Sequence, residues 1–123
     1  MLRKILHSKI HRARVTSARL DYVGSITIDA DILDAIGLRA NDEVIIANCD
    51  NGERFETYVF RGERGSRQII INGAAARLAG EGHTVIIMHY AYATEDEYRA
   101  FKPKVALMRP DNTIEEVITY DNR

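Results

Sequence analysis

The chain has 123 residues, a length typical of one domain with a single hydrophobic core. Lys and Arg number 17 and Asp and Glu 18, so the formal net charge of -1 gives no overall positive field that would attract nucleic acid or an anionic membrane. The single cysteine excludes an intrachain disulfide, and no apolar run approaches the ~20 residues that span a bilayer. We therefore expect one cytoplasmic domain, residues 1–123, without nucleic-acid or membrane partners.

The first part of the chain has mostly the two-residue periodicity of β-strands. Residues 10–20 spread a few apolar side chains among basic and hydroxyl ones and fit a strand only moderately well, whereas residues 25–29 alternate cleanly. Asp29 or Asp31 can then cap a short helix that ends at Gly37. This order predicts strands followed by a short helix.

A hairpin is predicted next. Residues 43–49 and 54–60 are rich in β-forming side chains, and the segment that joins them contains Asn51-Gly52. Asn-Gly is the strongest short-range hairpin signal. We therefore expect these two strands to pair.

The following elements are short. Residues 67–71 are an apolar run, and the alanine-rich residues 74–79 predict one or two turns of helix. Residues 84–92 form the most apolar strand of the chain, which predicts a barrel interior or a subunit contact.

The last part of the chain predicts a short helix at 95–101 and a pair of strands, 104–108 and 113–119, joined by a turn. Six or more short strands with two or three small helices favour a compact barrel over an open sheet. The expected fold is therefore mainly β.

Common catalytic motifs are absent from the sequence. It contains no GxGxxG, P-loop, CxxC or GxSxG, which excludes the usual dinucleotide, nucleoside-phosphate and hydrolase sites. His7 and His11 stand four residues apart without the glutamate of HExxH, so we interpret them as solvated histidines rather than metal ligands. We interpret Cys49 as a small buried thiol at the end of a strand rather than a nucleophile, and His83 and His89 as surface or interface residues. No metal site is expected.

Gly24-Ser25 lies between two predicted strands and has a specific chemical possibility. A serine hydroxyl can attack the carbonyl of the preceding residue to give an ester, which eliminates to dehydroalanine and hydrolyses to a pyruvoyl group. Glycine at the preceding position permits unusual backbone angles without a Cβ penalty. Taken alone, however, the pair favours a simple turn.

The surrounding motifs change that interpretation. In order, the chain contains HRARVT at 11–16, YVGSITID at 22–29, NGERFETY at 51–58, ERGS at 63–66 and NGAAA at 72–76. This series resembles the bacterial aspartate α-decarboxylase family, from about residue 9 to about residue 87 and more loosely to residue 105. The joint order is far more specific than any one motif.

The resemblance implies a fold, an assembly and an activity. The implied fold is a compact six-stranded double-psi β-barrel with small flanking helices, assembled as a tetramer with active sites between subunits. The implied proenzyme cuts itself into a β-chain, 1–24, and an α-chain, 25–123. The implied reaction converts L-aspartate to β-alanine and CO2 for pantothenate and coenzyme A biosynthesis, with a covalent pyruvoyl group and with neither pyridoxal phosphate nor a metal.

The resemblance also assigns roles to individual residues. Ser25 becomes the source of the pyruvoyl group, Gly24 the new C-terminus, and Tyr58 the proton donor. The implied substrate-binding residues are Lys9, Arg54, Thr57, Gly73, Ala74 and Ala75. The implied supporting residues are His11, Tyr22 and Asn72.

Elementary chemistry agrees with these residue types. Decarboxylation leaves an electron pair on carbon, so the enzyme must supply an electron sink, and a pyruvoyl ketone can do so. An arginine can hold the retained carboxylate with two hydrogen bonds. Arg54 and Tyr58 are four residues apart, which places both on one face of a strand, whereas Thr57 points to the other face unless a bulge intervenes.

Two alternatives stay open at this point. The first is a pyruvoyl decarboxylase that acts on a different amino acid. The second is a double-psi barrel without catalytic activity that serves as an interaction module, for which the chain would stay intact and carry no carbonyl group.

Overall fold

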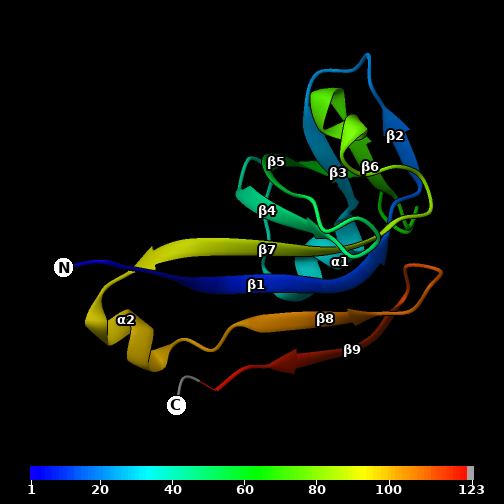
Figure 1. The fold of residues 1–123 in the computed structure, drawn as a ribbon. Helices are drawn as coiled ribbons and strands as arrows, with labels where there is room; N and C mark the ends of the chain where they lie inside the picture. The colour runs from blue at the N-terminus through cyan, green and yellow to red at the C-terminus, as the bar shows by residue number, and fades with distance from the viewer. Residues whose placement is uncertain (122–123) are drawn as a thin grey trace.

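The computed structural model describes residues 1–121, and these residues are mainly β (Figure 1). The strands are β1 (Arg3–Arg14), β2 (Ser17–Arg19), β3 (Ser25–Asp29), β4 (Glu43–Asn48), β5 (Arg54–Gly62), β6 (Ile69–Asn72), β7 (Thr84–Ala93), β8 (Lys104–Met108) and β9 (Ile114–Thr119). The helices are α1 (Ala30–Ile36), the 3-10 helix η1 (Gly73–Arg77) and α2 (Glu95–Ala100). The predicted domain and α-chain extend to residue 123, and their last two residues lie outside the described part.

The strands form one nine-stranded sheet in the order β2-β6-β3-β5-β4-β7-β1-β8-β9. β1 lies between antiparallel β7 and parallel β8, and β3 lies between parallel β5 and antiparallel β6. Strands that are distant in sequence are therefore neighbours. In Figure 1, β1, β7, β8 and β9 run side by side, and α2 lies near the N-terminus.

The prediction of a mainly β fold is confirmed, but the six-stranded double-psi topology is not. Within residues 1–121 the sheet has nine strands, and its end strands β2 and β9 are not hydrogen-bonded to each other. The arrangement is barrel-like without closure of the sheet.

β1 begins earlier than the sequence predicts, and bulges within it explain the difference. β1 has 12 residues and begins at Arg3 instead of at residue 10, because residues 3–9 pair with β7. The register shifts between Leu6 and Ser8 and again between Ile10 and Ala13, where Arg12 has a φ of 64°. These irregularities interrupt the two-residue periodicity. The predicted strand 10–20 is accordingly split into the end of β1 and the short β2.

Local signals predicted the other elements well. Asp29 caps α1 by accepting the backbone N–H of Asp31 at 2.8 Å, and Gly37 ends it with a φ of 75°. Asp29 also accepts the backbone N–H groups of Gly65 at 2.9 Å and Arg67 at 2.8 Å. One buried carboxylate thus fixes both the end of β3 and the loop that leads to β6.

The predicted strand pairs are confirmed, and the alanine-rich segment is helical as predicted. β4 pairs with β5 and β8 pairs with β9, both antiparallel. The alanine-rich segment forms the tighter 3-10 helix η1. β7 alternates buried and half-buried residues along its first half, because it lies in the middle of the sheet between β4 and β1.

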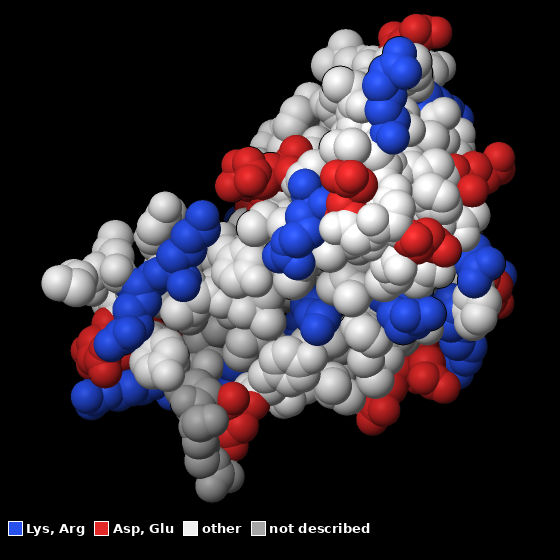
Figure 2. Space-filling view, in the orientation of Figure 1, with Lys and Arg blue, Asp and Glu red and all other residues white. Residues whose placement is uncertain are grey.

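The core consists almost entirely of aliphatic side chains. Its largest fully buried residues are Ile10, Ile26, Ile28, Leu33, Ile36, Ile46, Ile69, Ile71, Ile87, Val15, Val44 and Val59. Strands β1 and β3 to β8 and helix α1 contribute buried residues or residues packed against them, and Ile114 of β9 packs against the cluster, so the sheet and the helix share one core. On the face seen in Figure 2, acidic and basic side chains intermingle around uncharged areas.

No helix within residues 1–121 is long and apolar enough to cross a membrane.

Candidate active site

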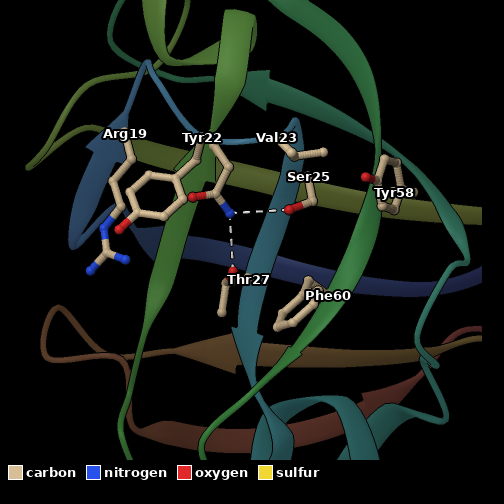
Figure 3. Close-up of a pocket in the computed structure, with 8 residues that line it drawn as sticks. Arg19, Tyr22, Val23, Ser25, Thr27, Tyr58 and Phe60 are labelled. Carbon is tan, nitrogen blue, oxygen red and sulfur yellow. Dashed lines mark hydrogen bonds between the residues drawn. The ribbon is translucent and has the colours of Figure 1, made fainter.

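A cavity of about 350 Å³ lies beside the first residue of β3. Side chains from β2, β3, β5 and β6 and from the segment between β2 and β3 line it (Figure 3). They are Arg19, Tyr22, Val23, Ser25, Thr27, Tyr58, Phe60 and Asn72. Four of the sequence-predicted site residues therefore meet here: Ser25, Tyr58, Tyr22 and Asn72.

The strand register explains why Ser25, Tyr58 and Asn72 meet. In the antiparallel pair of β3 and β6, Ser25 lies opposite Asn72. In the parallel pair of β3 and β5, Ile26 lies opposite Val59, so the residues before them, Ser25 and Tyr58, are also neighbours. The three side chains thus lie at one level on adjacent strands.

Ser25 is buried and held by a hydrogen bond. Its exposed fraction is 5%, and Asn72 Nδ2 donates to Ser25 Oγ at 3.1 Å (Figure 3). The same Nδ2 donates to Thr27 Oγ1 at 3.1 Å, because Thr27 follows Ser25 by two positions on the same face of β3. Ser25 Oγ accepts in this contact, so its own proton remains available for transfer.

The residue before Ser25 has a close backbone neighbour. Gly24 belongs to the segment that joins β2 to β3, and its backbone lies directly against Gly73, the first residue of η1. A buried serine hydroxyl with a donor on its oxygen, preceded by a closely packed glycine, is an arrangement suited to attack on the Gly24 carbonyl. The residues present therefore fit a pyruvoyl group derived from Ser25.

Large apolar side chains surround the cavity and are open to solvent. The exposed fractions are 60% for Tyr22, 83% for Val23, 40% for Tyr58 and 59% for Phe60. Tyr22 lies on the side of Ser25 opposite Tyr58 and Phe60 (Figure 3). The Arg19 guanidinium lies 5.1 Å from the centre of the Tyr22 ring, and Arg19 is the charged residue of the cavity lining.

Arg54 and Thr57 lie on β5 but do not line this cavity in the single chain. Arg54, Glu56 and Tyr58 are exposed, whereas Phe55 and Thr57 are half-buried. This alternation agrees with the expectation that Arg54 shares a face with Tyr58 and that Thr57 points the other way.

Lys9 and His11 lie on β1, between β7 and β8, and also do not line the cavity. Lys9 Nζ donates to the Tyr120 hydroxyl at 3.4 Å. His11 Nδ1 is buried and has no hydrogen-bond partner among residues 1–121. Burial lowers the pKa of His11, and the nearby cations Lys9 and Arg12 lower it further.

The remaining predicted residues, Gly73, Ala74 and Ala75, form the start of η1. They follow Asn72 directly, although their side chains are not part of the cavity lining. Among residues 1–121, no three His, Cys, Asp or Glu side chains gather closely enough to hold a metal ion. Cys49 is exposed, so the prediction that it is a buried thiol is wrong.

Sequence reasoning missed four lining residues. Thr27 and Phe60 could have been found, because each follows a predicted site residue by two positions on the same strand face. Arg19 and Val23 lie at the end of a three-residue strand and in the irregular segment after it. No periodic signal in the sequence points to either residue.

Comparisons with known proteins agree on one family. A family model described as aspartate decarboxylase matches residues 1–115. The aspartate 1-decarboxylases of Staphylococcus aureus strains JH9 and Newman are each 56% identical to this chain over 118 residues, which is 96% of this chain and 93% of each relative.

Proposed function

The chain belongs to the aspartate decarboxylase family, and from that premise we propose that it converts L-aspartate to β-alanine and CO2 with a pyruvoyl group made from its own Ser25. The observation that carries the proposal is the position of Ser25, which is buried, accepts a hydrogen bond from Asn72 and neighbours Tyr58. The reaction takes place in the cytoplasm and supplies β-alanine for pantothenate and coenzyme A biosynthesis.

Maturation begins with the bond between Gly24 and Ser25. Ser25 Oγ attacks the Gly24 carbonyl carbon, the C–N bond breaks, and the hydroxyl proton moves to the released nitrogen, which gives an ester. Loss of the Ser25 α-proton and cleavage of the Cβ–Oγ bond then release Gly24 as a carboxylate and leave dehydroalanine. Its enamine tautomerises, and water displaces ammonia to leave the pyruvoyl ketone.

The hydrogen bond from Asn72 supports this sequence. A donor to Ser25 Oγ stabilises the negative charge that develops on this oxygen when it loses its proton, and again when it leaves during elimination. Thr27 accepts the other contact of the same amide nitrogen, which helps to keep the amide directed at Ser25. Asn72 therefore has a supporting role before and after the chain is cut.

The pyruvoyl group supplies an electrophilic carbonyl that binds the substrate amine and accepts the electron pair left by the departing CO2. Tyr58 returns a proton to the carbon that has lost CO2, which requires its hydroxyl to lie within hydrogen-bond reach of that carbon. Its position beside Ser25 on the neighbouring strand supports this role.

Substrate binding requires cations and backbone donors near Ser25. In the proposal, Lys9 and Arg54 bind carboxylates of aspartate, and Thr57 with the start of η1 (Gly73, Ala74 and Ala75) provides further contacts. His11 and Tyr22 support the site. The carboxylate that leaves is kept among apolar side chains, where its charge is poorly solvated.

The open apolar rim supports a homo-oligomer, which we propose to be a tetramer with active sites between subunits. Tyr22, Val23, Tyr58 and Phe60 surround the cavity with exposed apolar surface of the kind that subunit contacts cover. A neighbouring copy can then contribute residues that do not line the cavity of one chain, such as Lys9.

One experiment tests the whole proposal. Mass spectrometry of the purified protein should show a fragment that ends at Gly24 and a second that begins with a pyruvoyl group. The same preparation of cleaved protein should release CO2 from aspartate faster than from glutamate or other amino acids. An intact chain without a carbonyl would favour an interaction module, and faster turnover of another amino acid would refute the substrate assignment.

A further inference from the structure

Gly73 packs unusually closely against the segment that is proposed to be cut. A Cβ atom placed on Gly73 would lie 2.7 Å from Gly24 Cα, 2.9 Å from Gly24 N and 3.1 Å from Tyr22 O. All three neighbours are backbone atoms, which cannot move aside as a flexible side chain can. Only glycine therefore allows η1 to begin at this distance from Gly24.

Among the glycines with a positive φ, only Gly73 also has a close backbone neighbour. A Cβ on Gly62 would lie 2.9 Å from the Ile28 carbonyl oxygen, but the φ of Gly62 is not positive. Gly37, Gly52 and Gly82 also have positive φ angles, of 75°, 76° and 85°, so each needs the same backbone freedom. A Cβ on Gly52 or Gly82 would meet nothing within 4 Å, and one on Gly37 would meet only a His7 carbon at 3.7 Å. The positive φ and the close approach occur together only at Gly73 among these four.

Gly73 and its predecessor contact both sides of the same peptide bond. Asn72 lies opposite Ser25 in the β3–β6 pair and donates to Ser25 Oγ. Gly73, the next residue, lies against the backbone of Gly24. Residues 72 and 73 thus face residues 25 and 24 across the gap between the two segments.

The residues just after η1 are also held in place by hydrogen bonds. The Leu78 carbonyl, just after η1, accepts Nδ2 of Asn48 and Nδ2 of Asn51, each at 3.0 Å. His83 Nδ1 accepts the backbone N–H of Gly80 at 3.0 Å. Because the segment is fixed at both ends, Gly73 cannot easily withdraw from Gly24.

We propose that Gly73 is a positioning residue for self-cleavage, whose missing side chain lets η1 hold the Gly24 carbonyl in place for attack by Ser25. This inference rests on the proposed function and is distinct from a substrate contact at Gly73. A methyl group would force the neighbouring backbone to retreat by roughly 0.7 Å to reach an ordinary 3.4 Å contact. A displacement of about 1 Å can slow a positioned reaction by about 10²-fold, so we expect cleavage to slow by about a hundredfold.

The test compares Gly73→Ala with Gly52→Ala. Both substitutions place a side chain at a positive φ, but only the first creates a clash. Cleavage is followed by mass spectrometry during incubation of freshly purified protein, and folding is followed by circular dichroism and thermal unfolding. Wild type and Gly52→Ala should be cut at similar rates, whereas Gly73→Ala should fold and remain largely intact.

Hydroxylamine near neutral pH distinguishes a positioning role from a later defect, because it cleaves an ester much faster than an amide. Mass spectrometry separates a cut after Gly24 from slow cleavage at the Asn51-Gly52 and Asn72-Gly73 bonds. If Gly73 positions the attack, Gly73→Ala should form the ester about a hundredfold more slowly than wild type, and hydroxylamine should not restore rapid cleavage after Gly24. Rapid cleavage of this variant after Gly24 by hydroxylamine would place the defect after the attack and overturn the inference. Ser25→Ala serves as the control that cannot form the ester at all.

A second variant guards against simple misfolding. Asparagine tolerates positive φ better than alanine but still carries a Cβ, so Gly73→Asn keeps the clash with less backbone strain. It should also remain uncut. Wild-type cleavage of either Gly73 variant, or failure of both to fold, would overturn the inference, whereas an uncut wild type would refute the proposed function itself.

Discussion

Tyr58→Phe and Ser25→Ala should fail at different steps. The Tyr58 hydroxyl has no hydrogen-bond partner among residues 1–121 and belongs to a side chain that is 40% exposed, so its removal should change stability by no more than about 0.5 kcal/mol. Tyr58→Phe should therefore fold and be cut normally. A general acid contributes about 10²- to 10⁴-fold to a rate, so β-alanine formation should fall by that factor, or about 2.7 to 5.4 kcal/mol.

Mass spectrometry with and without borohydride separates the two variants. Tyr58→Phe should give both fragments, and borohydride in the presence of aspartate should attach substrate-derived mass to the larger one. Ser25→Ala should stay intact and acquire no such mass, because it has no hydroxyl to attack Gly24. Formation of β-alanine by Tyr58→Phe at the wild-type rate would refute the assignment of Tyr58 as proton donor.

Three further predictions concern charge. Arg54→Ala should still be cleaved, but its kcat/KM for aspartate should fall by an amount that corresponds to about 2 to 5 kcal/mol of lost transition-state stabilisation. Wild-type kinetics in this variant would show that Arg54 does not bind the substrate. Hydrogen bonds from Arg61 and Arg64 hold the pKa of Asp34 well below its usual range, so its contribution to stability is present at neutral pH and is lost in acid. The difference in Tm between wild type and Asp34→Asn should narrow below about pH 4, and a difference independent of pH would contradict this. Burial, and to a smaller extent His89, lowers the pKa of His7, although Asp42 acts in the opposite direction. The folded protein therefore loses stability as pH falls below about 6.5, where the unfolded chain binds a proton at His7 more readily. His7→Phe should weaken this pH dependence of Tm.

Local signals in the sequence predicted the individual elements better than their arrangement. Asn51-Gly52 specified the β4–β5 hairpin, and the Asp29 cap and Gly37 stop specified α1, because each depends on a few adjacent residues. The neighbours of β3 could not be predicted in this way. Its pairing with β5 joins strands that are far apart in sequence, and its register depends on packing of the whole sheet.

For the candidate site, too, the sequence indicated several of the residues but not all of the contacts between them. The family motifs pointed to Ser25, Tyr58, Tyr22 and Asn72, and the structure brings these four together. The two-residue spacing from Ser25 places Thr27 on the same face of β3, but its shared hydrogen bond with the Asn72 amide is visible only in the structure. The family motifs pointed to Gly73 only as a substrate contact, and nothing in the sequence indicates its close approach to the backbone of Gly24.

The place of β1 in the sheet has a consequence for how the mature protein can refold. Cleavage after Gly24 would leave β1 and β2 on a separate short peptide, although β1 pairs along its length with β7 and also with β8. Folding of the uncut precursor is a unimolecular process, whereas recovery of the cut protein from denaturant requires two chains to meet and therefore depends on their concentration. The precursor should refold readily on dilution, but the processed form should recover poorly when dilute. Its persistence then depends on how slowly β1 leaves the sheet, a matter of unfolding rate instead of equilibrium.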